Sequence, residues 1–226
     1  MRVEEHESFE NIYWIESEGK KRKLATVNLA PGNKVYGEKL VKFRGTEYRC
    51  WDPYRSKIAA AVLRGIKGVP IKEGSKVLYL GAASGTTASH VSDIVGAKGI
   101  VYCIEISSRP LRDLLAVCEN RPNMIPILAD ATKVEVYRAM IEQADVVYQD
   151  VARPEQTEIA LENSLAYLKE EGHLMVALKA RSIDVTKEPR EIFQKEIERL
   201  EKEMEVLDSE LLDPYEEDHA MILLKK

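Results

Sequence analysis

Residues 76–87, KVLYLGAASGTT, constrain the fold of this chain more than any other dozen residues. An apolar run of strand length, 76–80, breaks into a turn of small residues, and a helical pattern begins directly after the turn at Thr86. A strand–turn–helix unit of this kind places free backbone amides and the positive end of a helix at the carboxyl edge of a sheet. Nucleotide-like ligands bind at that edge in open α/β proteins, so the spacing of the turn decides which ligand fits.

The spacing excludes two familiar nucleotide-binding motifs. The dehydrogenase fingerprint needs glycine at positions 81, 83 and 86, where this chain has Gly81, Ala83 and Thr86. A phosphate-binding P-loop needs Gly-Lys-Ser/Thr at its end, and this turn ends in Gly85, Thr86 and Thr87. What remains, two glycines separated by three small residues, lets a flat ligand lie close to the backbone. The alternative is a turn that only packs a helix tightly against a sheet.

The chain from residue 53 onward alternates between strand and helix patterns. A helix over 53–65 comes first, followed by strands at 76–80, 100–104, 124–128, 145–149 and 173–178. Helices fill the gaps at 86–95, 110–119, 134–141 and 155–168, and a long one covers 189–204. Two final strands, 205–212 and 220–224, follow with no helix between them. This order predicts an α/β fold with a mainly parallel sheet, right-handed crossovers and an antiparallel pair at its end.

The first fifty residues have a different pattern. Short β-rich runs at 11–15, 24–27 and 40–43 are separated by turn residues, and together they indicate a small β region. We therefore predict two domains, a small β-rich domain over 1–52 and an α/β domain over 53–226.

Charge is unevenly distributed along the chain. The net charge is −5, but residues 1–100 carry 17 Lys/Arg and 11 Asp/Glu, while residues 101–226 carry 16 and 27. The overall balance argues against a protein that holds nucleic acid unaided. The uneven split indicates either one face for a polyanion and another for a basic partner, or only a solubilising surface in a charge-rich, heat-adapted protein.

The sequence also indicates where in the cell the protein is found. No apolar run approaches the length of a membrane span, and the first seven residues are polar and acidic rather than a secretory signal, so we expect a cytoplasmic protein without a membrane partner. Cys50, Cys103 and Cys118 form neither a metal-binding pair nor a disulfide framework, and they are interpreted as small buried residues.

Successive predicted strands end in acids. Glu105 lies about twenty residues beyond the glycine turn, the distance at which an acid on the next strand reaches a ribose diol. Asp130 follows the third strand, where a carboxylate can accept from the exocyclic amine of an adenine, and Asp150 follows the fourth. One acid at a strand end is common as a helix cap. Three beside a glycine turn predict a ligand site.

Four long segments carry a resemblance to a known family. They are NLAPGNKVYGE (28–38), WDPYRSK (51–57), LGAASGTTASHVSD (80–93) and KARSIDVT (179–186). On these segments the whole chain resembles fibrillarin, the RNA 2′-O-methyltransferase of box C/D ribonucleoprotein particles. It resembles the archaeal type, because the glycine/arginine-rich N-terminal tail of the nucleolar members is absent.

The resemblance implies a fold, an activity and partners. The fold is a Rossmann-like methyltransferase sheet of seven strands with an antiparallel last strand, preceded by the small β-rich domain. The activity is S-adenosylmethionine (SAM)-dependent 2′-O-methylation of ribose in rRNA, and in tRNA as a further substrate. A box C/D guide RNA selects the target RNA, and a Nop-domain scaffold protein and a kink-turn-binding protein anchor the guide.

The resemblance also implies the cofactor-binding residues. Thr86 and Thr87 suit the methionine carboxylate at a helix N-terminus, Ile106 the adenine face, and Glu105 the ribose. Arg153 stands where many members carry Gln, near the sulfonium end of the cofactor. The full set is Gly81, Ala83, Gly85, Thr86, Thr87, Glu105, Ile106, Asp130, Ala131, Asp150, Val151, Ala152 and Arg153.

The catalytic set implied by the resemblance is Lys57, Asp150, Lys179 and His219. Lys179 ends the fifth strand beside Asp150, which would orient its ammonium, and Lys57 would supply a second positive charge. A lysine beside a reacting hydroxyl serves either as base or as electrostatic stabiliser, and spacing leaves both open. His90, in the first crossover helix, is interpreted as structural.

Two other functions compete with RNA methylation. A metal-dependent small-molecule O-methyltransferase of the catechol kind would need clustered Asp and Asn oxygens, and no Asp-Asn pair follows Asp150. A non-catalytic scaffold subunit of a ribonucleoprotein would keep the fold without needing Lys57, Asp150, Lys179 and His219.

Overall fold

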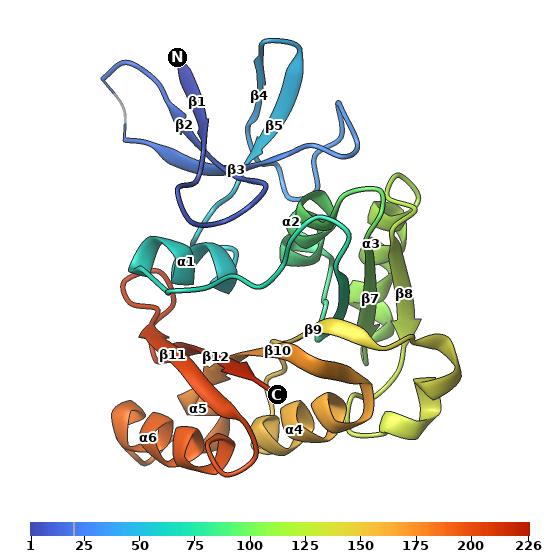
Figure 1. Ribbon diagram of the computed structural model, residues 1–226, viewed down its shortest axis with the longest axis vertical. Helices are drawn as coiled ribbons and strands as arrows, with labels where there is room; N and C mark the ends of the chain where they lie inside the picture. Colours follow the sequence, from blue (N-terminus) through green and yellow to red (C-terminus); the bar gives the residue numbers. More distant parts are fainter. Residues whose placement is uncertain (20) are drawn as a thin grey trace.

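The computed structural model describes residues 1–19 and 21–226, which form two sheets (Figure 1). The smaller sheet is antiparallel, with strand order β1-β2-β3-β5-β4, and lies at one end of the molecule (Figure 1). Its strands are β1 (Arg2–Glu5), β2 (Ile12–Glu16), β3 (Lys23–Val27), β4 (Leu40–Phe43) and β5 (Thr46–Cys50).

The larger sheet has seven strands in the order β11-β12-β10-β9-β6-β7-β8. Only β12 runs antiparallel to its neighbours, β10 and β11, and the remaining pairs are parallel. The predicted mainly parallel sheet with an antiparallel last strand is therefore confirmed. Its strands are β6 (Lys76–Leu80), β7 (Ile100–Glu105), β8 (Met124–Leu128), β9 (Ala144–Gln149), β10 (Leu168–Lys179), β11 (Glu205–Leu211) and β12 (His219–Lys225).

The helices cover both faces of the larger sheet. They are α1 (Lys57–Arg64), α2 (Thr86–Val95), α3 (Ser108–Cys118), α4 (Gln156–Tyr167), α5 (Ala180–Ile183) and α6 (Pro189–Leu200), with a 3₁₀ helix, η1, at Val134–Met140. Alternate residues of β6 point to opposite faces. Val77 and Tyr79 pack in one core with α1, α2 and α3, and Leu78 and Leu80 pack in the other with α4 and α6. None of the described helices is long and apolar enough to cross a membrane.

Several predicted elements differ from the observed ones. The strands β1 and β5 were not predicted; β1 is an edge strand whose exposed charged residues hide its pattern, and only its Val3, opposite Ile15, packs inward. The helix predicted at 53–65 begins only at Lys57, because residues 52–56 turn first, with the Tyr54 N–H donating to Asp52 Oδ1 at 3.0 Å. The helix predicted over 134–141 is the 3₁₀ helix η1.

The two sheets share one apolar core. Trp14 and Leu24 of the smaller sheet belong to the same buried cluster as Ile58 of α1 and Val91 of α2. The smaller sheet ends at Cys50 and α1 begins at Lys57, while the domain boundary between residues 52 and 53 stays a prediction.

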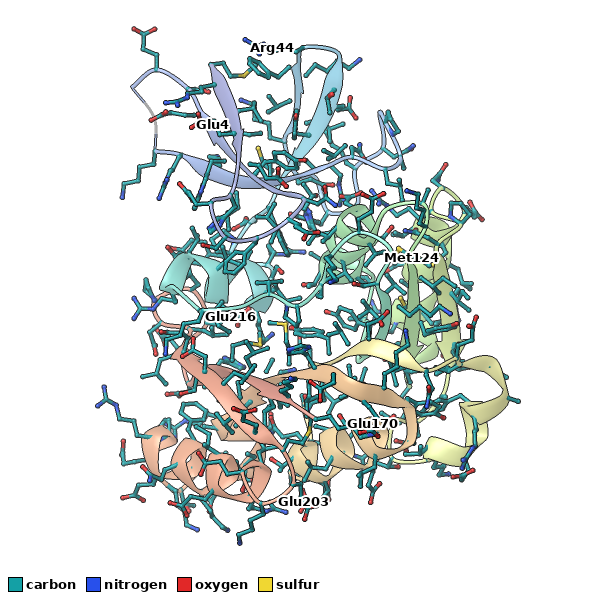
Figure 2. The ribbon with its side chains drawn as sticks, viewed as in Figure 1. Glu4, Arg44, Met124, Glu170, Glu203 and Glu216 are labelled. Carbon is teal, nitrogen blue, oxygen red and sulfur yellow. The ribbon has the colours of Figure 1, made fainter. Side chains whose placement is uncertain are left out.

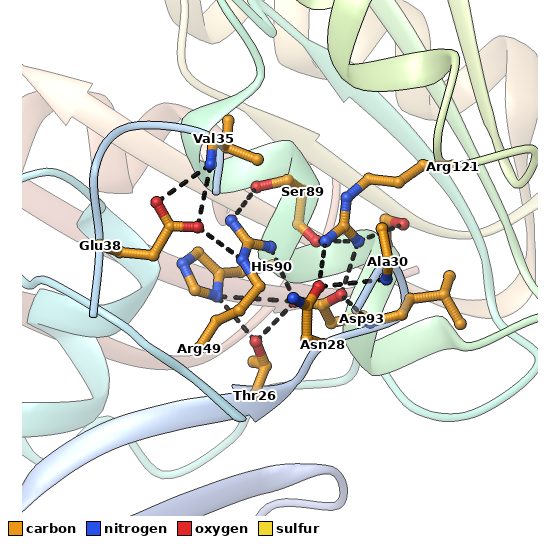
Figure 3. Close-up of polar contacts among 12 residues, drawn as sticks. Thr26, Asn28, Ala30, Val35, Glu38, Arg49, Ser89, His90, Asp93 and Arg121 are labelled. Atoms are coloured by element: carbon orange, nitrogen blue, oxygen red, sulfur yellow. Dashed lines mark hydrogen bonds and ion pairs between the residues drawn. The ribbon is translucent and has the colours of Figure 1, made fainter. Parts of the chain in front are cut away.

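A buried ionic network also joins the smaller sheet to α2 (Figure 3). Arg49 of β5 donates to Glu38 at 2.7 Å, to Asp93 at 2.8 Å and to Ser89 at 2.9 Å. Arg121, which follows α3, donates to the other oxygen of Asp93 at 2.5 Å. Both guanidinium groups are almost entirely shielded from solvent, so Asp93 holds two buried positive charges together.

His90 lies beside this network, in agreement with the structural role predicted for it. Its two ring nitrogens contact the hydroxyls of Thr26 and Tyr36, each at 2.8 Å, and its ring stacks on Trp51 with centroids 4.9 Å apart. Burial, with the positive charges of Arg49 and Arg121 as further causes, holds the pKa of His90 well below its ordinary 6.5. The folded state therefore keeps this imidazole neutral.

This burial predicts a pH dependence of stability. Above pH 6.5 the stabilisation from neutral His90 is complete, and it is lost as the pH falls below 6.5, because only the unfolded chain then binds the proton. We expect the free energy of unfolding, measured in urea, to fall by up to about 1.4 kcal/mol per pH unit on account of this group. His90→Gln removes that slope, and the partly buried control His173→Gln retains most of it. Equal slopes for wild type and His90→Gln would contradict the prediction.

Candidate active site

The glycine turn between β6 and α2 lies at the carboxyl edge of the larger sheet. At this point the chain order of the strands reverses, because β6 has β7 and β8 on one side and β9 and β10 on the other. The amides of Gly81 and Ala82 donate to the carbonyl of Ile104 at 2.9 and 3.0 Å, which fixes the turn against β7. Gly81 has φ +83°, and a Cβ added to it would lie 3.0 Å from the carbonyl oxygen of Asp150. Glycine is therefore needed here both for its backbone conformation and for the close approach of β9.

A pocket of about 280 Å³ opens beside this turn. It brings together most of the predicted cofactor residues, namely Gly81, Ala83, Glu105, Ile106, Asp130, Ala131, Asp150, Val151, Ala152 and Arg153, and it is also lined by Lys179. Gly85, Thr86 and Thr87 do not line it. Thr86 lines a neighbouring pocket of about 390 Å³, and Thr87 is buried. The predicted set is thus divided between the pocket and the start of α2.

The Glu105 side chain connects the glycine turn to the start of α3 through two hydrogen bonds. One carboxylate oxygen accepts from the amide of Ala83 and the other from the amide of Ser107, both at 2.8 Å. The side chain is buried, so these two bonds hold it in a fixed orientation between the glycine turn and α3. Each carboxylate oxygen can accept a second hydrogen bond, which leaves Glu105 able to receive two hydroxyls of a ligand.

Asp130, Arg153 and Ile106 define the outer part of the pocket. Asp130 accepts from the amide of Thr132 at 3.0 Å, and this hydrogen bond holds its pKa below the ordinary value. Arg153 lies 3.7 Å from the second oxygen of Asp130, so the residue that departs from the common Gln has an acidic partner within this chain. Ile106 is 57% exposed, an apolar surface open to a flat ring.

Asp150 lies between two ammonium groups at the inner end of the pocket. Lys179 Nζ donates to the main-chain carbonyl of Asp150 at 2.7 Å and lies 2.8 Å from its Oδ1. Lys57 Nζ, from the first residue of α1, lies 3.2 Å from the same Oδ1 and 3.4 Å from Oδ2. All three side chains are mostly buried, so their charges act in a medium of lower dielectric than water.

His219 reaches the same edge through the antiparallel ladder. It pairs directly with Lys179 in the β10–β12 register, and its Nδ1 lies 3.8 Å from Glu216. Burial and the nearby charge of Lys57 lower the pKa of His219, while Glu216 partly opposes that shift. Within the described residues its buried Nδ1 has no hydrogen-bond partner. A neutral imidazole with an unused nitrogen is equipped to accept a proton near neutral pH.

Two residues support these side chains without having been predicted. Glu216, in the β11–β12 loop, lies 3.7 Å from Lys57 Nζ, and Figure 2 labels it beside α1. Gln156 is fully buried; it accepts from the Lys179 amide at 2.8 Å and donates to the Lys179 carbonyl at 3.2 Å. The one available signal for Glu216 is its position three residues before His219.

The described part of the chain contains no group of three His, Cys, Asp or Glu side chains that could hold a metal ion.

Comparison with known proteins gives the family. The fibrillarin family model matches residues 3–226. The chain belongs to the fibrillarin family. A fibrillarin-like rRNA/tRNA 2′-O-methyltransferase of Methanopyrus kandleri is 54% identical over 224 residues, which cover 99% of this chain and 97% of that protein.

Solved fibrillarin structures share the whole fold. Fibrillarin of Aeropyrum pernix, solved with natively bound S-adenosyl-L-methionine, superposes with a TM-score of 0.93 at 47% identity, covering 99% of this chain and 98% of that one. A fibrillarin solved in complex with Nop5p has a TM-score of 0.87 at 39% identity, covering 98% and 99% of the two chains. The predicted family and fold class are both confirmed.

Proposed function

We propose that this protein transfers a methyl group from SAM to the 2′-hydroxyl of a ribose in rRNA or tRNA. The observation that carries the proposal is the pairing of Asp150 with both Lys57 and Lys179 at the inner end of the pocket beside the glycine turn. The naming of highly identical relatives as rRNA/tRNA 2′-O-methyltransferases supports the same activity.

The residues of the pocket fit the adenosine half of SAM. Glu105 has free acceptor capacity for both ribose hydroxyls, Asp130 accepts from the adenine amine, and exposed Ile106 covers the ring. Gly81 leaves room where any Cβ would meet the backbone of Asp150. The amino end of α2, where Thr86 is partly exposed and Thr87 is buried, suits the methionine carboxylate through its free backbone N–H groups.

SAM supplies a methyl group already activated on a sulfonium, so the protein's task is to align the ribose oxygen and manage its proton. As the O–CH₃ bond forms and the S–CH₃ bond breaks, the hydroxyl proton must leave. Lys179, held by Asp150 and Gln156, donates toward the ribose oxygen and stabilises its developing negative charge. Neutral His219 accepts the proton, and the Lys57 ammonium, 3.2 Å from Oδ1, holds the Asp150 carboxylate in place.

The decisive experiment is transfer of labelled methyl from SAM to guide-paired RNA in a reconstituted particle, with the label mapped to the ribose. We expect label on one 2′-oxygen, unaffected by a metal chelator. Label that disappears with chelator would favour the metal-dependent O-methyltransferase, and label on a base would overturn the assignment.

The particle itself is part of the proposal. A chain of net charge −5 binds RNA phosphates poorly alone, so we propose that a Nop-domain scaffold protein, a kink-turn-binding protein and a box C/D guide RNA bring the target to it. The fibrillarin–Nop5p complex, whose fibrillarin shares this fold, supports the scaffold. We further propose a cytoplasmic location for the particle. Equal methylation of bare RNA without these partners would contradict the assembly.

Glu105→Gln is expected to weaken SAM binding about tenfold or more. The new amide NH₂ must face either the Ala83 or the Ser107 N–H, and an unpaired buried donor costs about 1–3 kcal/mol. Calorimetric titration with SAM measures the loss. Glu203→Gln, an exposed change on the turn after α6, is the matched control and leaves the affinity unchanged. Equal affinities of Glu105→Gln and wild type for SAM would show that Glu105 does not bind the cofactor.

A further inference from the structure

A basic groove of about 610 Å³ lies between the smaller sheet and the catalytic edge. Its walls come from the chain entering β3, the segment before β4, residues 51–55 before α1, and Tyr215 in the β11–β12 loop. Figure 1 shows this loop lying close to α1, with the smaller sheet above them. The five basic residues that line the groove are Lys21, Arg22, Lys23, Lys39 and Arg55.

Most of these positive charges are not neutralised by the protein. Lys21, Lys23, Lys39 and Arg55 are exposed, and none of them has a carboxylate within 4 Å in the described chain. Arg22 is engaged elsewhere, 3.9 Å from Glu7 and over the ring of Trp14.

Of the two acids that line the groove, one is already neutralised. Glu38 is buried in its ion pair with Arg49, and Asp52 is exposed and accepts from the Tyr54 amide. In a chain with an overall negative charge, a groove with four free cations indicates a polyanionic occupant.

Aromatic side chains lie among the cations. Tyr54 is 61% exposed and meets Tyr215 edge-to-face, with ring centroids 5.2 Å apart. The Arg55 guanidinium lies 5.9 Å from the ring centre of Tyr36. Cations along a groove combined with exposed aromatic rings are typical of surfaces that hold single-stranded nucleic acid, since phosphates meet the cations and bases stack on the rings.

Two residues that line the basic groove are close in sequence to residues of the reactive centre. Arg55 lies two residues before Lys57, and Tyr215 immediately precedes Glu216, which is 3.7 Å from the Lys57 ammonium. We propose that the groove holds a single-stranded stretch of the target RNA that flanks the part paired with the guide. Lys21, Lys23, Lys39 and Arg55 contact its phosphates, and Tyr54 stacks on an unpaired base. This inference rests on the proposed function, since it takes the target ribose to lie at Lys179.

The first test measures binding of the isolated full chain to a labelled single-stranded RNA of about 12 nucleotides, within the usual site size, by fluorescence anisotropy at several salt concentrations. Replacing Lys21, Lys23 and Lys39 together with alanine is expected to make the slope of log affinity against log salt shallower by about 2. Tyr54→Ala is expected to weaken binding between about fivefold and a hundredfold.

The matched control is Lys195→Ala with Lys202→Ala, two exposed lysines on and after α6. Figure 2 labels the neighbouring Glu203 at the end of the molecule far from the smaller sheet. This control is expected to leave the salt slope unchanged. A slope that is the same for the groove variant, the control and the wild type would overturn the proposal.

The second test uses the reconstituted particle. The triple lysine variant is expected to raise KM for target RNA while kcat at saturating RNA and the affinity for SAM stay at wild-type values. Loss of the scaffold protein from the particle with RNA affinity unchanged would overturn the proposal and assign the groove to a protein partner. If wild type itself transfers no methyl to RNA, the proposed function fails, and the salt slope still judges the groove separately.

Discussion

Replacing Lys179 with alanine is expected to lower the rate of methyl transfer to guide-paired RNA by at least about a hundredfold. The change removes an ammonium that both lines the cofactor pocket and lies 2.8 Å from Asp150 Oδ1. Without it, the more distant Lys57 is left to offset both the Asp150 carboxylate and the negative charge that grows on the ribose oxygen. Single-turnover kinetics with saturating SAM and RNA measure the chemical step.

Lys169→Ala is a matched control for Lys179→Ala. Lys169 lies on the same strand, β10, and is also paired with an aspartate, Asp145, at 2.6 Å, but it lies toward the opposite edge of the sheet. It is expected to keep the wild-type rate. Unchanged methylation by Lys179→Ala would favour the non-catalytic scaffold, because the pocket would then persist without its reactive group.

Replacing Asp93 with alanine is expected to cost about 3–5 kcal/mol of unfolding free energy. The change leaves the guanidiniums of Arg49 and Arg121 buried with only Glu38 to balance them, and it removes the acceptor for the Thr26 hydroxyl and the Leu29 amide. Urea denaturation at pH 7.5, followed by circular dichroism, measures the loss.

Glu135→Ala provides the comparison for Asp93. Glu135 forms an exposed pair with Arg138 at 3.0 Å, and its removal is expected to change stability by about 0.5 kcal/mol or less. A loss below about 1 kcal/mol for Asp93→Ala would mean that water or a rearranged carboxylate reaches the two arginines.

The sequence predicted the fold best where one local rule acts alone. The strand 76–80 and the helix 86–95 are observed with the predicted bounds, because an apolar run and the glycine turn directly after it carry strong local signals. The buried network was not predicted, because a buried Arg49 and Asp93, 44 residues apart, look in sequence like any two surface charges.

The candidate site also contains residues that could be predicted from the sequence and residues that could not. Glu105 is the last residue of β7, and Asp130 and Asp150 follow the ends of β8 and β9. Because parallel strands bring their carboxyl ends together, the shared pocket of these acids could be predicted. Lys57 and His219 were predicted as site residues only because the resemblance to the family implies them. Glu216 lies in an irregular loop and Gln156 acts through the backbone of Lys179, and neither role has a sequence pattern of its own.

The reversed direction of β12 has a consequence for how the site is supplied. Parallel strands place only the residues at their carboxyl ends at this edge, and three of those residues are the acids Glu105, Asp130 and Asp150. Because β12 runs the other way, it delivers its first residue, His219, opposite Lys179. A parallel β12 of seven residues would carry that imidazole to the far edge of the sheet, about 20 Å away. The antiparallel direction of β12 therefore places an imidazole at an edge of the sheet whose other site residues are acids and lysines.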